Sequence, residues 1–371
     1  MLNFIKSKYI LKIILKNIKN RIKLKIIRHN KSILNRLNIT LEDFKVYNTL
    51  EDLNNIFGLN IKDVDIKKLD LSKKIIDDDE FQILKKIKFK ELKSLNLSEN
   101  KLSNINILEK LNYKKLKILD IKNNRIKDIN ILEKVNFKEL TVLNLSNNEI
   151  TSINILEKVN FKQLILLNLS ANHLSDICDL EKANFKVLKE LDLSSNEISD
   201  INLLEKVHFK ELKVLNLSSN EIVDINPLVL AHFEELEKLG LNFNKISDIN
   251  ALGKVNFPKL KVLSLFNNKI SDITILKKVK FKELKELYLR NNMITDINIL
   301  EESNFNELKL IDLSHNMISD IDVLKRVKFD KLNKLFISYN LINKDENSSI
   351  FNYLKSKIKN LFYKILNYKK I

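Results

Sequence analysis

Several residue types that mark common enzyme and metal sites are scarce in this 371-residue sequence. A single cysteine, Cys178, excludes an intramolecular disulfide and any metal site built on several cysteines. The three glycines, Gly58, Gly240 and Gly253, are too far apart to form either common glycine-rich phosphate loop. Five scattered histidines provide no pair at a metal-ligand spacing. We therefore expect no catalytic residue, no metal and no cofactor, and hence no enzyme.

The basic charge is confined to the two ends of the chain. The formal net charge is +17, and residues 1–37 hold eleven Lys and Arg with no acid, while residues 350–371 hold six Lys with no acid. The stretch between them is formally neutral, with 48 basic and 48 acidic residues. Nucleic-acid binding would have to depend on the tails, where only Phe4 and Tyr9 interleave with the basic residues near the N-terminus, so we regard it as unlikely.

A repeat of 24 residues occupies most of the chain, and such a fixed period is typical of solenoids. Each copy reads approximately L-x-x-L-x-L-S-x-N-x-I-x-D-I-x-x-L-E-K-V-x-F-K-E, and residues 66–91 form an earlier, degenerate copy with two extra residues. One asparagine recurs in every regular copy, at Asn100, Asn124, Asn148, Asn172, Asn196, Asn220, Asn244, Asn268, Asn292, Asn316 and Asn340.

The repeated segment resembles the signature of leucine-rich repeat proteins, L-x-x-L-x-L-x-x-N-x-I. It is most similar to the short-repeat subclass found in phosphatase-regulatory and internalin-type proteins, through Asn124, Ile126, Ile129 and Leu132. The resemblance implies an α/β leucine-rich-repeat solenoid of about eleven to twelve repeats, with a parallel concave sheet and short convex helices.

The residue pattern independently supports this architecture. Alternating apolar residues such as Leu119 and Ile121 point inward from a short strand. The asparagine that follows can donate to and accept from backbone groups at the turn, and stacked asparagines would form a hydrogen-bonded ladder. A repeated aspartate, as at Asp128, is a plausible N-cap for a short outer helix. An aromatic residue closes each copy and predicts a buried aromatic spine.

The chain divides into three predicted segments. Residues 1–65 form a basic amphipathic N-terminal extension and N-terminal cap, residues 66–342 the solenoid, and residues 343–371 a C-terminal capping helix. Residues 1–37 could be a structural extension, an anchor to anionic membrane surfaces or an organelle-targeting sequence, or could simply reflect the chain's lysine-rich composition. Their longest apolar run, residues 13–15, is too short for a secretory signal or a membrane span.

Large side chains gather at outward strand positions in the C-terminal half, where the N-terminal half has Asn, Asp and Ser. Four of them come from successive repeats, each one or two residues earlier in its strand, and predict a diagonal stripe on the concave face. Asn242 and Asp312 are polar neighbours of this stripe. An alternative is that residues 343–371 fold back and cover it. The candidate partner-binding residues are Phe243, Phe266, Tyr288, Arg290, Leu310, His315, Phe336 and Tyr339.

The sequence therefore predicts a non-enzymatic protein–protein interaction scaffold or regulatory subunit that binds its partner on the concave face. A membrane-peripheral adaptor anchored by the basic N-terminal helix, or an internalin-like adhesion or effector protein, are the alternatives. The resemblance makes a phosphatase partner conceivable, although no partner-reading residue can be assigned from it. The lone thiol and the lack of cysteine-stapled caps favour a cytoplasmic location, with membrane-surface association left open.

Overall fold

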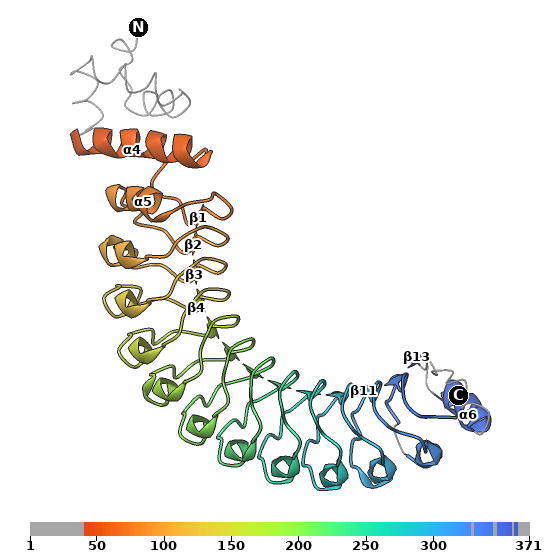
Figure 1. Ribbon diagram of the computed structural model, residues 1–371. Coiled ribbons are helices and arrows are strands. Elements are labelled where there is room, and N and C mark those ends of the chain that lie inside the picture. Colours follow the sequence, from red (N-terminus) through yellow and green to blue (C-terminus); the bar gives the residue numbers. More distant parts are fainter. Residues whose placement is uncertain (1–40, 328–329, 344–346, 358–359, 363–371) are drawn as a thin grey trace.

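The protein forms an open, curved solenoid with one strand of each repeat on its inner side and a short helical turn on its outer side (Figure 1). The computed structural model describes residues 41–327, 330–343, 347–357 and 360–362. The predictions for residues 1–37 lie outside this described part.

Thirteen strands of three residues each form a single parallel sheet in chain order within the described residues. Neighbouring strands are offset by 24 residues, as in Leu167 opposite Leu191, except at the two ends of the sheet, where the offset is 26. The strands are β1 Lys68–Asp70, β2 Ser94–Asn96, β3 Ile118–Asp120, β4 Val142–Asn144, β5 Leu166–Asn168, β6 Glu190–Asp192, β7 Val214–Asn216, β8 Lys238–Gly240, β9 Val262–Ser264, β10 Glu286–Tyr288, β11 Leu310–Asp312, β12 Lys334–Phe336 and β13 Asn360–Phe362.

The alternation within each strand determines which side chains reach the concave surface. The central residue of β6, Leu191, is buried, as is Leu193 two residues later, whereas Glu190 and Asp192 point to the opposite face. The same pattern holds in the other repeats and produces one continuous core. The predicted solenoid with a parallel concave sheet is confirmed.

The asparagine column joins the backbone of neighbouring repeats. Asn196 Nδ2 donates to the carbonyl oxygens of Leu193 and Ser194 in its own repeat and of Leu169 in the preceding one, at 3.0–3.2 Å. Its Oδ1 accepts from the Leu174 N–H at 3.0 Å. The prediction that this amide both donates and accepts is confirmed, but the bonds run to backbone groups rather than from one asparagine to the next.

The outer turns are single turns of 3-10 helix rather than α-helix. Tight 3-10 turns fit the few residues that a 24-residue repeat leaves on its outer side. They are η2 Gln82–Lys86, η3 Asn106–Lys110, η4 Asn130–Glu133, η5 Asn154–Glu157, η6 Cys178–Lys182, η7 Asn202–Glu205, η8 Asn226–Val229, η9 Asn250–Gly253, η10 Thr274–Lys277, η11 Asn298–Glu302 and η12 Asp322–Lys325.

The repeated aspartate lies one residue before the N-cap, so its assignment as the N-cap was wrong. The N-cap of η4 is Ile129, whose side chain makes no capping hydrogen bond. Asp128 Oδ1 nevertheless accepts from the N–H of Asn130, the first residue of η4, at 2.8 Å. The aspartate thus stabilises the start of the turn as an Asx-turn.

True α-helices lie near the two ends of the solenoid. Helix α4 spans Leu41–Phe57 and packs against η2, and α5 spans Asp78–Phe81 in the degenerate first repeat. Helix α6 spans Ser348–Lys357 and packs against η12, and β13 then adds to the edge of the sheet. The two inter-strand segments that contain α5 and α6 are the longer ones, which gives each room for α-helical residues.

Tyr113 belongs to the buried aromatic column. Its hydroxyl should make the protein less stable than phenylalanine at this position would. Its hydroxyl is buried without a hydrogen-bond partner among the described residues, and burial raises its pKa. Phe89 packs against it, with ring centroids 6.2 Å apart. Because a buried unpaired hydroxyl costs about 1–3 kcal/mol, Tyr113→Phe should raise the free energy of unfolding by about 1 kcal/mol in urea titrations. The matched change Phe137→Tyr should lower it, and a less stable Tyr113→Phe protein would contradict the prediction.

A chain of ion pairs crosses the sheet at Glu237 and makes stability depend on pH. Hydrogen bonds from Lys261 Nζ at 2.8 Å and from Lys213 Nζ at 3.0 Å lower the pKa of Glu237 to about 2. The folded state therefore gains stability from this carboxylate above about pH 4.5, and loses it as the pH falls toward 2.

Replacing Glu237 with glutamine should therefore remove stability at neutral pH but not near pH 2. Because the pair is partly exposed, the difference at pH 7 should stay below about 1 kcal/mol. Urea titrations of both proteins between pH 2 and pH 7 measure it. Glu234→Gln, at an exposed glutamate without an ion-pair partner in the described part of the chain, is the control. Parallel curves for wild type and Glu237→Gln would contradict the prediction.

Candidate partner-binding surface

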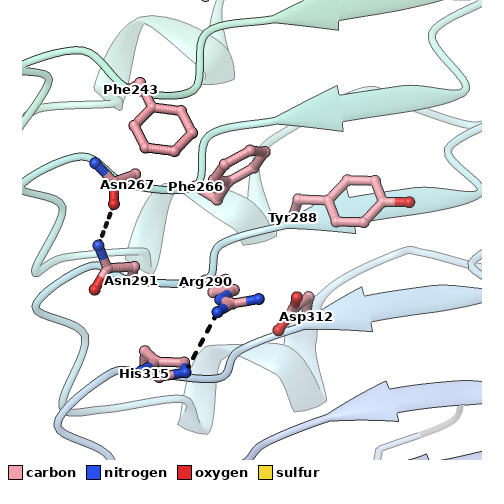
Figure 2. Close-up of a pocket in the computed structure, with 8 residues that line it drawn as sticks. All are labelled: Phe243, Phe266, Asn267, Tyr288, Arg290, Asn291, Asp312 and His315. Carbon is pink, nitrogen blue, oxygen red and sulfur yellow. Dashed lines mark hydrogen bonds between the residues drawn. The ribbon is translucent and has the colours of Figure 1, made fainter. Parts of the chain in front are cut away.

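A cavity of about 570 Å³ opens on the concave side where β8 to β11 end. Figure 2 shows its side chains crossing four successive repeats, with Phe243, Phe266 and Tyr288 in a diagonal line. The lining residues are Phe243, Phe266, Asn267, Tyr288, Arg290, Asn291, Asp312 and His315.

Two phenylalanines form the apolar end of the cavity. The ring of Phe243 meets that of Phe266 edge to face, with centroids 5.1 Å apart and an interplanar angle of 79°. Phe243 is nevertheless 47% exposed. Edge-to-face pairs are a favoured aromatic arrangement, so the two rings hold one another while a large apolar surface faces solvent.

The backbone of Phe243 has a conformation that bulky residues seldom adopt. Its φ is +54°, in the left-handed region, as in the residue before each repeated asparagine. Elsewhere this left-handed column holds mostly small or polar residues, and bulky rings occur in three of its places: Phe243, His315 and Tyr339. Because every regular repeat has this backbone conformation, the feature specific to these three places is the ring that each one presents at the surface. The other members are Lys73, Glu99, Asn123, Asn147, Ala171, Ser195, Ser219, Asn267 and Asn291.

Tyr288 is held at its polar end by a hydrogen bond. Its hydroxyl donates to Glu286 Oε2 at 2.8 Å, and burial together with this bond raises the pKa of Tyr288 to about 12. The phenol is a hydrogen-bond donor to Glu286 and is protonated at physiological pH, as an ordinary tyrosine is.

The polar end of the cavity is formed by Arg290 and His315. Arg290 Nη2 lies 3.5 Å from His315 Nε2, and the imidazole stacks on the ring of Tyr339 with centroids 4.3 Å apart. Burial, and then the charge of Arg290, lower the pKa of His315, whereas Asp312 opposes them. The imidazole is thus mainly neutral at pH 7, and the guanidinium supplies the positive charge of this end.

The structure brings together five of the eight predicted residues: Phe243, Phe266, Tyr288, Arg290 and His315 line one cavity. Tyr339 contacts it through its stack on His315. Leu310 and Phe336 lie on β11 and β12 and are outside its lining in the described structure.

Two lining residues, Asn267 and Asn291, were not predicted. Their position in the repeat could have identified them. Both come immediately before a repeated asparagine, and the residues at this place form the left-handed column that turns toward the rim of the concave face. Asn242, predicted as a polar neighbour of the stripe, accepts hydrogen bonds from the hydroxyls of Ser218 and Ser264 and is outside the cavity lining.

The described part of the C-terminal segment continues the solenoid instead of covering the cavity. Helix α6 packs against η12, β13 pairs with β12, and neither contributes to the cavity lining. The division of the chain into three segments remains a prediction.

Other reactive residues do not form a second site in the described residues. Cys178 is exposed, and its thiol donates to Asp176 Oδ2 at 3.4 Å, which raises the pKa of the thiol. His173 lies 3.0 Å from Glu197 on repeats remote from His315. Within the described residues, no three His, Cys, Asp or Glu side chains are placed to hold a metal ion. The helices there include none that is long and apolar enough to cross a membrane.

Comparison with protein-family models identifies the type of these repeats. The family model of leucine-rich repeats in two copies matches residues 234–278 and 282–326, and two further leucine-rich repeat models match residues 187–246 and 139–158. The chain is a leucine-rich repeat protein. No curated protein matches its sequence. The repeat fold is typically a non-enzymatic domain for protein–protein interaction.

Solved structures show which repeat type the leucine-rich repeat protein resembles. It is similar to an internalin of Listeria monocytogenes at 28% identity, with a TM-score of 0.67 over 86% of this chain and 91% of the internalin. A leucine-rich repeat protein of Leptospira interrogans has the same fold, at 20% identity and a TM-score of 0.55, over 85% of this chain and 97% of that protein. The repeats are therefore of the internalin type.

Proposed function

We propose that this leucine-rich repeat protein is a non-enzymatic scaffold or regulatory subunit that binds a protein partner at the concave cavity. The observation that carries the proposal is the half-exposed Phe243, whose edge-to-face pair with Phe266 continues into Tyr288 and Arg290. Exposed aromatic residues and arginine are the residue types enriched in binding hot spots.

The rigid setting of these side chains also supports binding rather than core packing. They come from three successive repeats, with Tyr288 and Arg290 in the same one, and the asparagine column bonds the backbone of each repeat to its neighbour. Tyr288 is also held by its hydrogen bond to Glu286. A surface that is already ordered loses little conformational entropy when a partner binds.

The test compares affinity capture from the native lysate by the wild type and by a triple-serine variant, Phe243→Ser, Phe266→Ser and Tyr288→Ser. Other repeats already carry serine at the equivalent positions, as at Ser219, Ser194 and Ser264, so the variant should fold. Circular dichroism and thermal melting check this directly. The expected result is a protein recovered by the wild type and lost from the triple-serine variant.

A matched control removes exposed apolar side chains away from the cavity. Val223 and Leu230 are 55% and 57% exposed and do not line it. Val223→Ser with Leu230→Ser should retain the partner. Equal capture by the folded triple-serine variant would overturn the cavity as the binding site, and loss of capture in the control would show that apolar surface in general is responsible.

An internalin-like adhesion or effector role is the second candidate, favoured by the similarity to the Listeria internalin over most of both chains. The two candidates differ in location: the scaffold acts in the cytoplasm, whereas an effector is exported. Immunodetection in cell and medium fractions of the source organism separates them. Full retention of the protein in the cell fraction would exclude the exported role.

A membrane-peripheral adaptor anchored through residues 1–37 depends on residues outside the described structure. Cosedimentation of the full chain with anionic vesicles, at low and high salt, tests it. Binding lost on deletion of residues 1–37 would support this adaptor role, and no binding at low salt would remove it. A phosphatase partner would be supported if the wild type captured a phosphatase from the lysate and the triple-serine variant did not.

A further inference from the structure

An apolar edge adjoins the cavity in the last three regular repeats. The residue after each repeated asparagine forms an edge column, which is charged or histidine in eight repeats: Lys101, Arg125, Glu149, His173, Glu197, Glu221, Lys245 and Lys269. In the next three repeats the same column changes to Met293, Met317 and Leu341, which are 47%, 46% and 55% exposed.

This change is confined to the side chains and does not reflect a different fold. The N–H of Met317 donates to the Ile294 carbonyl at 2.9 Å, as the N–H of Lys245 donates to that of Ile222. Polar members of the column make contacts between repeats, such as His173 with Glu197 and Lys245 with Glu221. The three apolar residues therefore expose hydrophobic surface where the fold accepts charge, and such a contiguous patch is typical of a binding site.

The edge lies next to the cavity along the chain, although its residues are outside the lining. Met293 follows the cavity residue Asn291 by two positions, Met317 follows His315, and Leu341 follows Tyr339, which stacks on His315. Methionine side chains are flexible and polarizable, so this edge can adapt to irregular apolar groups.

Arg290 gives the same surface a charge preference. Arg290 has no carboxylate at ion-pair distance in the described structure. By contrast, many lysine and arginine side chains of the solenoid pair with a glutamate of a neighbouring repeat. Asp312 lines the cavity too, but its Oδ1 accepts from the N–H and hydroxyl of Ser314, and no ion pair joins Asp312 to Arg290 in the described residues. The guanidinium therefore remains available for an incoming carboxylate, to which it can donate two parallel hydrogen bonds.

We propose that the partner presents an extended segment in which an acidic side chain binds Arg290 while flanking apolar side chains cover Phe243, Phe266 and the Met293–Met317–Leu341 edge. This rests on the proposed function and specifies its partner's chemistry. Charge complementarity at Arg290 favours a protein segment with an acidic residue over a purely apolar occupant.

Selection from a phage-displayed library of random dodecapeptides tests this chemistry on the full chain. The wild type should enrich peptides with Asp or Glu beside aromatic or large aliphatic residues. Arg290→Glu should lose this acidic preference and bind the wild-type peptides at least about tenfold more weakly. Arg290→Gln should show a smaller loss, because it removes the charge without adding repulsion.

An edge variant tests the second half of the surface. Met293→Lys, Met317→Glu and Leu341→Lys restore the charged character that this column has in earlier repeats, so folding should be retained. Affinity for the selected peptides should fall about tenfold or more. The matched control, Arg125→Glu with Glu149→Lys and Glu197→Lys, alters the same column away from the cavity and should leave affinity unchanged.

The outcomes separate this inference from the proposed function. Peptides without acidic enrichment that bind Arg290→Glu equally well would overturn the charge assignment, and equal affinity in the edge variant would overturn the edge. Either result would leave the cavity as the binding site if the triple-serine variant still loses those peptides. Equal binding by the triple-serine variant would overturn both proposals. A wild-type dimer in light scattering that the edge variant abolishes would assign the surface to a second copy of the chain and reject the partner segment.

Discussion

Asn196→Ala is expected to lower the free energy of unfolding by about 3 kcal/mol, because the N–H of Leu174 and the carbonyls of Leu169 and Leu193 lose a buried partner at about 1 kcal/mol or more each. The Ser194 carbonyl still accepts from the N–H of Ala171. The side chain of Asn196 is 8% exposed and bonds to three carbonyl oxygens and one N–H. These bonds join the repeat of β6 to the preceding repeat, so the variant should weaken the solenoid near its middle. Urea titration followed by circular dichroism measures the loss.

The neighbouring residue provides a matched control. Ser195→Ala changes an exposed side chain in the left-handed column, where Ala171 already occupies the equivalent position, so stability should change little. Asn196→Asp retains an acceptor but loses the donating amide and buries a charge, and should also be strongly destabilising. If Asn196→Ala and Ser195→Ala have similar stability, the asparagine bonds do not hold the repeats together.

A weakened junction should also change the cooperativity of unfolding. Each repeat contacts mainly its neighbours, so the stability of a solenoid is a sum of repeat and interface contributions. Hydrogen exchange should therefore show the largest loss of protection around Leu169, Leu174 and Leu193, whose backbone groups bond to Asn196. Protection near α6 should change least.

The fold was largely predictable because the same physical demand recurs in every repeat. In each repeat, apolar residues such as Leu191 bury one face of the strand, and an asparagine such as Asn196 bonds to the backbone of the turn. The fixed spacing of 24 residues stacks these strands and turns in register. The type of outer turn was harder to predict, because Ile129 and Leu132 have the same spacing in a 3-10 turn as in an α-helical turn. The aspartate was misplaced by one residue for this reason.

The candidate site was only partly predictable, because its position depends on the backbone conformation of individual residues. The alternation of the strands predicted Tyr288 and Phe266 on the concave face. Phe243 and His315 lie beyond the strands, at left-handed positions that turn the side chain toward the rim, and Asn267 and Asn291 share that conformation. Leu310 follows the strand pattern equally well but lies outside the cavity. The diagonal line of large residues extends beyond the cavity lining after Tyr288.

Phe243→Asn is expected to weaken partner binding strongly while leaving stability nearly unchanged. Asparagine, which occupies the same column at Asn267, suits the left-handed backbone, so relief of strain should favour the variant by about 1 kcal/mol. Loss of the edge-to-face contact with Phe266 costs about 0.5–1.5 kcal/mol, so the two effects should nearly cancel. Truncating a central hot-spot ring costs about 2 kcal/mol of binding, or roughly thirtyfold in affinity.

Thermal melting and titration calorimetry with the captured partner measure the two effects separately. Ser219→Asn, one repeat earlier in the left-handed column and outside the cavity lining, should leave both quantities unchanged. A Phe243→Asn protein that melts much earlier would show that the ring is part of the core, because lost packing would then exceed the relief of strain. Unchanged affinity in a folded variant would show that Phe243 makes no contact with the partner. Only weaker binding at constant stability agrees with a strained ring that is retained for recognition.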